Sequence, residues 1–482
     1  MMQRASFDDK VVLGVILCIA LAFRVVGLNQ PLWYDELITL YTHIKLPWSE
    51  MMSDYEMNHH YLFSFQAKMV AEVFGESAWA LRLPALLFGV GSIAAMWVLA
   101  RDVAGTKVAH VSSLLLAISY HHIWFSQNAR GYTELMFWCI LGVIFFLRGL
   151  KHPKLMAWLW FAVVLALAVF THLTGAFFFF SLGVVWLGWS VIKLIKRDLK
   201  PAEIWLPSIG FILGGALTLL LYLPVLSGVI DNAGSVGDTS GIDAMQEYQN
   251  PIWTVLEAIR TVAGGLGPLI SIMAVLIISL TVLGAIRIFN RAPLFGIIVF
   301  AHILLTMALL VTLGMRVWPR FFFIDIGFLL TLIVLGVISL CDLISRALPV
   351  LNSKQWFGLA AVGMVLVSLA LTTQNYRAPK QNLPGPIELI ASQDSEAEVF
   401  AVGFVSDVYA DYLALPWGKI KSNDDLKTAL KSSDNLWLVV GFPARSFRAV
   451  SHLENAVEGF DLVRKFPGTL GDGNILVYKS KP

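Results

Sequence analysis

Charged residues are scarce in this chain of 482 residues: Asp, Glu, Lys and Arg make up 14% of it. Soluble globular domains contain roughly 25%. Hydrophobic residues account for 57% of the chain. One large soluble core is excluded, because these apolar runs would leave too little polar surface to cover it. The formal net charge of +2 gives no indication of a nucleic-acid partner.

Cysteine is also rare, and motifs for phosphate-bearing cofactors are missing. Cys18, Cys139 and Cys341 all lie in apolar runs. Neither a disulfide framework nor a thiol nucleophile is therefore indicated. The sequence contains no P-loop and no dinucleotide-binding fingerprint, so no nucleotide site is predicted.

Long apolar runs are abundant instead, and each is near the ~20 residues that cross a bilayer. We predict an α-helical polytopic membrane protein with about eleven transmembrane helices. The expected spans lie near residues 11–28, 83–100, 108–126, 132–149, 155–171, 174–193, 204–225, 267–286, 294–313, 321–341 and 356–373. No small-x-small cleavage site follows the first run, so we interpret it as an uncleaved helix rather than a signal peptide.

Lysine and arginine are concentrated in alternate loops, which predicts the orientation of the chain. The cation-rich loops should be cytoplasmic; they contain Arg101 and Lys107, Arg148 to Lys154, Lys193 to Lys200, Arg287 and Arg291, and Arg346 and Lys354. The N-terminus is then inside, and an odd number of spans places the C-terminal segment outside.

Three external segments are expected. The loop 29–82 contains an amphipathic stretch, YLFSFQAKMVAEVFG, that is typical of an interfacial helix. The Gly-, Ser- and Asp-rich loop 226–266 is predicted to be mobile and to act as a lid. Residues 374–482 follow the membrane part, 1–373, and their short runs EVFAVGFV, LWLVVGF and NILVY predict a small α/β accessory domain.

The sharpest candidate site is Asp35-Glu36, directly after the first span. Paired acids beside the membrane are costly to desolvate without a function. A carboxylate there could take a proton from an acceptor hydroxyl or amine as a general base. The alternative is a solvated pair of loop residues.

The sequence MNHHYLF adds His59, His60 and Tyr61 in the same external loop. These side chains could bind a divalent metal with the acids, or hydrogen-bond a sugar. Interface histidines without a ligand are an equally good interpretation.

External arginines form the third candidate group. Arg130 and Glu134 lie in the short turn FSQNARGYTELM, and Arg316 and Arg320 flank VWPRFFFID. Guanidinium groups suit bidentate phosphate binding, and outer-face arginines run against the positive-inside trend. Glu134 is a second candidate acid or a partner for Arg130. Snorkelling toward headgroups is the alternative for the arginines.

At these residues the chain resembles the GT-C glycosyltransferase superfamily, and within it the bacterial protein O-mannosyltransferases and lipid A aminoarabinose transferases, a glycosyltransferase family 39-like group. The resemblance rests on WYDE, MNHHYLF, SAWALRLPALLFGV, FSQNARGYTELM and VWPRFFFID, in that order through the membrane part. It implies a polyprenyl-phosphate sugar donor, inverting transfer, and an extracytoplasmic site in a bacterial inner or plasma membrane.

The resemblance also implies residue roles. Asp35 would be the base, supported by Glu36. Arg320, and with it Arg130, would bind the donor phosphate, and Arg82 would pair with an acid of the loop. Many relatives have His-Pro-Pro-Leu where this chain has His59-His60-Tyr61-Leu62, which leaves the metal site of some relatives open here.

Two other classes of function remain as alternatives. A transporter or flippase of a lipid-linked saccharide would also need helices and arginines, but it more typically shows broken helices or inverted repeats. A non-catalytic scaffold presenting the tail would not need Asp35. The sugar, the acceptor (glycan, lipid or protein) and any metal requirement do not follow from the sequence.

Overall fold

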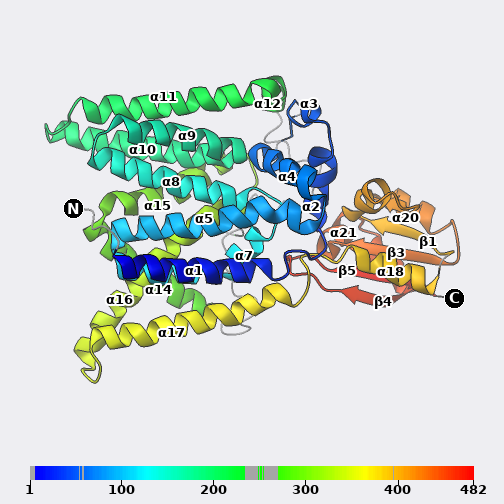
Figure 1. The fold of residues 1–482 in the computed structure, drawn as a ribbon. Helices are drawn as coiled ribbons and strands as arrows, with labels where there is room; N and C mark the ends of the chain where they lie inside the picture. Colours follow the sequence, from blue (N-terminus) through cyan, green and yellow to red (C-terminus); the bar gives the residue numbers. More distant parts are fainter. Residues whose placement is uncertain are drawn as a thin grey trace.

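The chain folds into a long bundle of helices with a small sheet domain at one end (Figure 1). The structure is a computed structural model, and it describes residues 6–53, 55–56, 59–233, 248, 250–251, 253, 270–394 and 396–481. Most of the predicted lid loop, 226–266, lies outside the described residues. Its first eight residues are helical, as α12 (Leu226–Ala233).

In the bundle, helices occupy each of the regions predicted as spans, although the region 108–126 is divided in two and not every helix is long and apolar. Its helices are α1 (Phe7–Val25), α5 (Ala78–Ala104), α6 (Thr106–Ala117), α7 (Tyr120–Ser126), α8 (Tyr132–Lys151), α9 (Leu155–Thr171), α10 (Thr174–Ile195), α11 (Ala202–Tyr222), α14 (Ile270–Arg291), α15 (Pro293–Thr312), α16 (Ile326–Ala347) and α17 (Ser353–Thr372). Within the described residues, 8 helical segments are long and apolar enough to cross a membrane. The chain is therefore an integral membrane protein.

Three of the predicted spans differ from these eight. The α1 helix has 19 residues but carries Asp8, Asp9, Lys10 and Arg24, and α9 has only 17 residues. The prediction of one continuous helix over 108–126 is wrong, because the chain breaks at Ile118 and Ser119 between α6 and α7. The hydroxyls of Ser368 and Thr372 on α17 donate to the freed Ile118 carbonyl, which satisfies the broken ladder.

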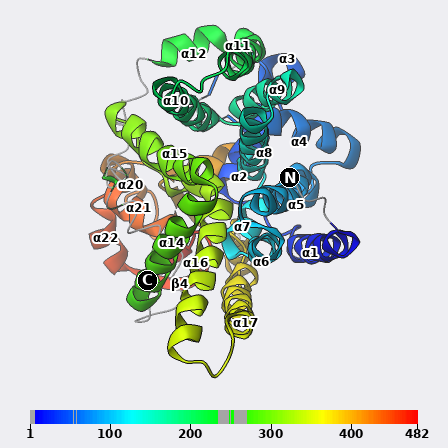
Figure 2. The same ribbon diagram turned by 90° about the vertical axis from the view of Figure 1, so that its left-hand side faces the viewer.

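The cation-rich connections lie together at one end of the bundle. Successive long helices alternate in direction, so the α5–α6, α8–α9, α10–α11, α14–α15 and α16–α17 connections are at the end opposite the sheet domain (Figure 1). Figure 2 looks along the bundle and shows α14, α16 and α17 on one side and α9, α10 and α11 on the other.

Between α1 and α5 the chain forms short helices at the sheet-domain end. They are α2 (Tyr34–Thr39), a π-helical turn η1 (Leu40–Ile44), α3 (Trp48–Met51) and α4 (Tyr61–Phe74). The α4 helix is amphipathic, as predicted: Phe63 and Ala67 are buried, whereas Met69 and Val73 are exposed. An exposed apolar stripe of this kind suits a helix in the membrane interface.

The C-terminal part is a five-stranded sheet with strand order β2-β1-β3-β5-β4. The strands are β1 (Glu398–Val402), β2 (Gly418–Ile420), β3 (Leu436–Gly441), β4 (Phe460–Phe466) and β5 (Ile475–Ser480), and the helices between them include α18 (Pro384–Gln393), α20 (Asn423–Ala429), α21 (Pro443–Ala449) and α22 (Leu453–Ala456). The first three strands are parallel, and β5 is antiparallel to β3 and β4. The predicted small α/β domain is confirmed, with β2 and β4 added.

The sheet domain packs directly on α2. Leu37 belongs to the same hydrophobic cluster as the strand residues Val399 and Val439. The Tyr34 ring meets Phe442 edge-on, with ring centroids 5.3 Å apart. The Tyr41 ring stacks on Tyr412 at the same separation. The segment that carries Asp35-Glu36 is thus held between the bundle and the sheet domain.

The α14 and α16 helices approach each other closely through two glycines. A Cβ atom on Gly284 would lie 1.8 Å from the Leu332 carbonyl oxygen, and one on Gly336 would lie 1.9 Å from that of Leu280. Small residues allow such backbone contact between membrane helices.

We expect Gly284→Ala to force α14 and α16 apart and to destabilise the protein by about 1–3 kcal/mol. Thermal unfolding in detergent measures this loss. Gly358→Ala on α17 is the matched control, because a Cβ there meets nothing within 4 Å. Equal midpoints for the two variants would contradict the close packing.

Candidate active site

Glu36 is completely buried and is held by a bidentate ion pair. Arg82 Nε donates to Glu36 Oε1 at 2.7 Å and Arg82 Nη2 donates to Oε2 at 2.6 Å. The backbone N–H groups of Ala129 and Trp33 donate to the same two oxygens, at 2.6 and 3.2 Å. A carboxylate accepts about four hydrogen bonds. Glu36 is therefore fully occupied and has no capacity left to act as a base.

Arg82 extends this network to the end of α1. Its remaining N–H groups donate to the carbonyls of Leu28, Gln30 and Pro31 at 2.7–3.1 Å. Burial would raise the pKa of Glu36, but the positive charge and hydrogen bonds of Arg82 hold it below its ordinary value. Glu36 thus remains ionised and fixes the loop that follows the first helix.

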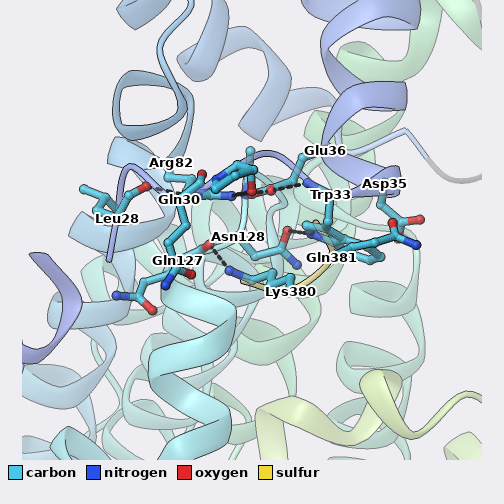
Figure 3. Close-up of polar contacts among 12 residues, drawn as sticks. Leu28, Gln30, Trp33, Asp35, Glu36, Arg82, Gln127, Asn128, Lys380 and Gln381 are labelled. Atoms are coloured by element: carbon cyan, nitrogen blue, oxygen red, sulfur yellow. Dashed lines mark hydrogen bonds and ion pairs between the residues drawn. The ribbon is translucent and has the colours of Figure 1, made fainter. Parts of the chain in front are cut away.

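Lys380, in the connection between α17 and the sheet domain, joins this network (Figure 3). Its side chain is 5% exposed, donates to the Gln127 carbonyl oxygen, and lies 5.1 Å from the centre of the Trp124 ring. Asn128, which follows Gln127 in the chain, accepts a hydrogen bond from the Trp33 indole N–H at 2.9 Å. Burial, and then the charge of Arg82, lowers the pKa of Lys380 to about 7.

Asp35 points away from this network, although it is adjacent to Glu36 in the chain (Figure 3). Its carboxylate lies 3.6 Å from Arg320 Nη1, and 15% of its side chain is exposed. Arg320 comes from the 3₁₀ turn η5 (Pro319–Asp325) and also lies over the Trp318 ring, 4.8 Å from its centre. An accessible carboxylate and a guanidinium thus meet at the sheet-domain end of the bundle.

The other two candidate arginines differ in position. Arg130 is buried, and its Nη1 donates to the Thr39 hydroxyl at 3.0 Å, one helical turn after Asp35. Arg316 lies in the connection between α15 and η5 and is partly buried. The described ion pair of Asp35 involves Arg320 and not Arg316.

The adjacent histidines point into different surroundings. His59 stacks on His43, with ring centroids 3.7 Å apart, and His43 pairs with Glu56 at 3.0 Å. Burial, followed by the charge of His43, lowers the pKa of His59 to about 2. His60 instead accepts the Gly131 N–H on its Nδ1 atom at 3.1 Å and lies near His172. Tyr61 packs against Phe170 in the core.

Glu134 is buried on α8, away from the ion pairs above. Gln66 on α4 donates to its Oε1 atom at 2.8 Å, and the Trp138 indole donates to the same atom at 3.3 Å. The hydrogen-bond partners of Glu134 are thus Gln66 and Trp138 rather than Arg130. The acid instead joins α8 to the interfacial helix α4.

The described part of the chain contains no preformed set of metal ligands. No group of three or more His, Cys, Asp or Glu side chains lies there in an arrangement that could hold a metal ion. Met57 and Asn58, beside the two histidines, lie outside the described residues. The divalent metal therefore stays an untested prediction.

An apolar cavity of about 560 Å³ opens between α9, α10 and α11. Its walls include Leu165, Val169, Phe179 and Tyr222, and it reaches Leu173, the residue after His172. The cavity thus includes the sheet-domain end of α10, where Leu173 lies.

This architecture is similar to that of known membrane glycosyltransferases. Residues 58–227 match the family model for dolichyl-phosphate-mannose-protein mannosyltransferase. ArnT from Cupriavidus metallidurans superposes with a TM-score of 0.54 at 15% identity, covering 97% of this chain and 98% of that one. The chain therefore has the fold of ArnT. The family model and this fold together confirm the resemblance to GT-C glycosyltransferases that the sequence predicts.

Two further GT-C structures carry ligands. ArnT from the same organism has been solved bound to undecaprenyl phosphate (TM-score 0.53, 15% identity, 97% and 99% coverage). The oligosaccharyltransferase AglB from Archaeoglobus fulgidus has been solved with an inhibitory peptide and a dolichol-phosphate (TM-score 0.54, 13% identity, 97% and 74% coverage). No curated protein sequence matches this chain.

Two sets of residues at this candidate site are not predicted by the sequence. Lys380 lies in RAPKQNLPGP, whose composition is typical of a linker. A lysine between prolines is the one sign in this segment of a specific contact. Thr39 and His43 were also missed, because a helix and a π-helical turn place them beside Arg130 and His59 only after folding.

Replacing Arg82 by Met should destabilise the protein by about 3–5 kcal/mol, because Glu36 would be left as an uncompensated buried charge. Thermal unfolding in detergent measures the change. Lys427→Met breaks an exposed pair with Asp424 and should cost at most about 1 kcal/mol. Similar losses for both variants would show that the Glu36 pair does not anchor the loop.

Lys380 predicts a pH dependence of stability. Its pKa of about 7 in the folded chain lies below the ordinary value, so the unfolded chain binds the extra proton at higher pH. Stability should therefore rise between pH 7 and the ordinary lysine pKa of about 10.4. Lys380→Met should remove this rise, as measured by unfolding midpoints across the range. A slope unchanged in the variant would assign the effect to other groups.

Proposed function

We propose that this protein is an inverting glycosyltransferase that moves a sugar from a polyprenyl-phosphate donor to an acceptor on the extracytoplasmic side. The observation that carries the proposal is the pairing of Asp35 and Arg320, 3.6 Å apart, where the helix bundle meets the sheet domain. A base and a phosphate-binding cation are the two groups that this displacement requires.

Asp35 acts as the general base in this proposal. The acceptor hydroxyl or amine attacks the anomeric carbon of the sugar and loses its proton to Asp35. At the same time the bond between that carbon and the phosphate oxygen breaks, and its electron pair leaves on the phosphate. One carboxylate is sufficient, because direct displacement inverts the anomeric carbon and forms no glycosyl-enzyme intermediate.

Glu36 supports the reaction without taking part in proton transfer. All four of its acceptor positions are occupied, whereas the neighbouring Asp35 is partly exposed. The two acids therefore have different roles although they are consecutive in the chain. Arg82 acts through Glu36, as a residue that positions the Asp35 segment.

The arginines bind the donor phosphate. Arg320 lies beside the base, and Arg130 is fixed to the same segment through Thr39. Cations at this place stabilise the charge that develops on the leaving phosphate. Arg316 is assigned to the edge of this site, on the connection that leads to Arg320.

The donor lipid fits the membrane part of the site. The apolar cavity between α9, α10 and α11 suits an isoprenoid chain, because its walls are almost entirely hydrocarbon and include Leu173 near the start of α10. The undecaprenyl phosphate in ArnT and the dolichol-phosphate in AglB support this donor class. The acceptor, a glycan, a lipid or a protein, approaches from the side of the sheet domain.

Asp35→Asn should reduce transfer at least 100-fold, the lower end of what a general base contributes, while donor binding persists. The assay offers radiolabelled polyprenyl-phosphate sugars and membrane extract to the purified protein. Asp407→Asn is the matched control, because this acid lies in the sheet domain and pairs with Lys419 and Lys421. Equal transfer by Asp35→Asn and wild type would remove Asp35 as the base, and transfer from nucleotide sugars alone would remove the donor class.

A further inference from the structure

Three aromatic side chains meet beside the turns that carry Arg130 and Arg320. This His–Tyr cluster consists of His60, Tyr132 and His172. The ring centroids of the two histidines lie 4.6 Å apart, and that of Tyr132 lies 4.9 Å from His60 and 5.8 Å from His172. All three residues are more than nine-tenths buried.

The backbone fixes which ring nitrogen carries the proton. The Gly131 N–H donates to Nδ1 of His60, and the Thr174 N–H donates to Nδ1 of His172, each at 3.1 Å. An imidazole nitrogen that accepts a hydrogen bond cannot hold a proton, so in the neutral ring the proton is on Nε2. Both histidines therefore present an Nε2–H group as a donor.

These rings are neutral rather than imidazolium. Burial lowers the pKa of His60 far below its ordinary value, and the charge of Arg130 lowers it further. The pKa of His172 falls to about 3 for the same two reasons, with a smaller contribution from Arg320. Both arginines are next in sequence to residues that contact the cluster. Gly131 follows Arg130 and donates to His60. The ring centroid of Phe321, which follows Arg320, lies 5.9 Å from that of His172.

Several of these donors have no acceptor within the described residues. His60 Nε2, the Tyr132 hydroxyl and Arg320 Nε are all buried and make no hydrogen bond there. Each buried unsatisfied donor destabilises a protein by about 1–3 kcal/mol. Two of them belong to rings whose centroids are 4.9 Å apart, and the third is on the turn whose Phe321 ring contacts His172, which indicates a place that is completed by a bound acceptor.

The chemistry of the groups identifies that acceptor. A sugar hydroxyl is recognised by a mixture of donors and acceptors, whereas an anion accepts from donors alone. Two imidazole N–H groups, a phenol O–H group and a guanidinium N–H group supply donors and positive charge. The ligand that fits them is a phosphate group with several unprotonated oxygens.

We propose that the His–Tyr cluster binds the phosphate oxygens of the lipid-linked donor, next to Arg320. The inference rests on the proposed function and names additional residues of its phosphate site. The cluster supplies neutral hydrogen bonds that fix the orientation of the phosphate, and the arginines supply the charge. It also gives His60 a role that requires no metal.

Two substitutions remove a donor and leave the packing in place. Tyr132→Phe deletes only the hydroxyl and keeps the ring contacts. His60→Asn keeps an oxygen that can accept the Gly131 N–H but lacks the Nε2–H group. Each variant should bind undecaprenyl phosphate about tenfold more weakly than wild type, and Tyr132→Phe should unfold at the same or a higher temperature.

The controls separate this role from packing. Tyr409→Phe removes a buried hydroxyl that does have a partner, the Leu383 carbonyl oxygen at 3.0 Å. That variant should lose stability and keep its affinity. Arg320→Ala should weaken binding of undecaprenyl phosphate as well. Binding of undecaprenol, the same chain without phosphate, should be unchanged in Tyr132→Phe and His60→Asn.

The outcomes distinguish failure of the cluster from failure of the function. If wild type does not bind undecaprenyl phosphate, the proposed function and this inference both fall. If wild type and Arg320→Ala behave as expected but Tyr132→Phe and His60→Asn bind like wild type, the cluster is only packing and the function stands. If the two variants lose undecaprenol binding equally, they act on the lipid chain, which also overturns the phosphate role.

Discussion

The buried ion pair between Glu36 and Arg82 is the constraint on which the site depends. It closes the loop after the first helix, because Arg82 also holds the carbonyls of Leu28, Gln30 and Pro31. The same carboxylate ties that loop to the α7–α8 turn through Ala129. Desolvating such a pair is costly, and its complete set of hydrogen bonds offsets that cost. Because the Glu36–Arg82 pair fixes this loop, the neighbouring Asp35 is held facing Arg320.

The layout of the membrane part follows from the sequence because it depends on local patterns. Hydropathy predicts where the long helices lie, and the loop cations predict that five connections share one end of the bundle. The division of 108–126 into α6 and α7 could not be predicted in this way. It depends on hydroxyls of α17, some 250 residues later, that satisfy the Ile118 carbonyl.

The candidate site shows the same division between local and distant information. The composition of WYDE and VWPRFFFID points to Asp35 and Arg320, since an acid and a cation beside the membrane are unusual. The different roles of Asp35 and Glu36 could not be read from two consecutive acids. They arise because a helix turns neighbouring side chains in different directions, one toward Arg82 and one toward η5. The position of Lys380 could not be predicted either, because its partners Gln127 and Trp124 are about 250 residues earlier in the chain.

The position of Lys380 and the sheet domain has a consequence for biosynthesis. The last helix of the bundle ends at Thr372, so Lys380 and the aromatic residues that hold Tyr34 are synthesised after all of the bundle helices. A nascent chain with a complete bundle still lacks the groups that clamp the Asp35 segment. Assembly of the candidate site therefore requires the C-terminal part of the chain, and a chain truncated before Lys380 would lack these contacts.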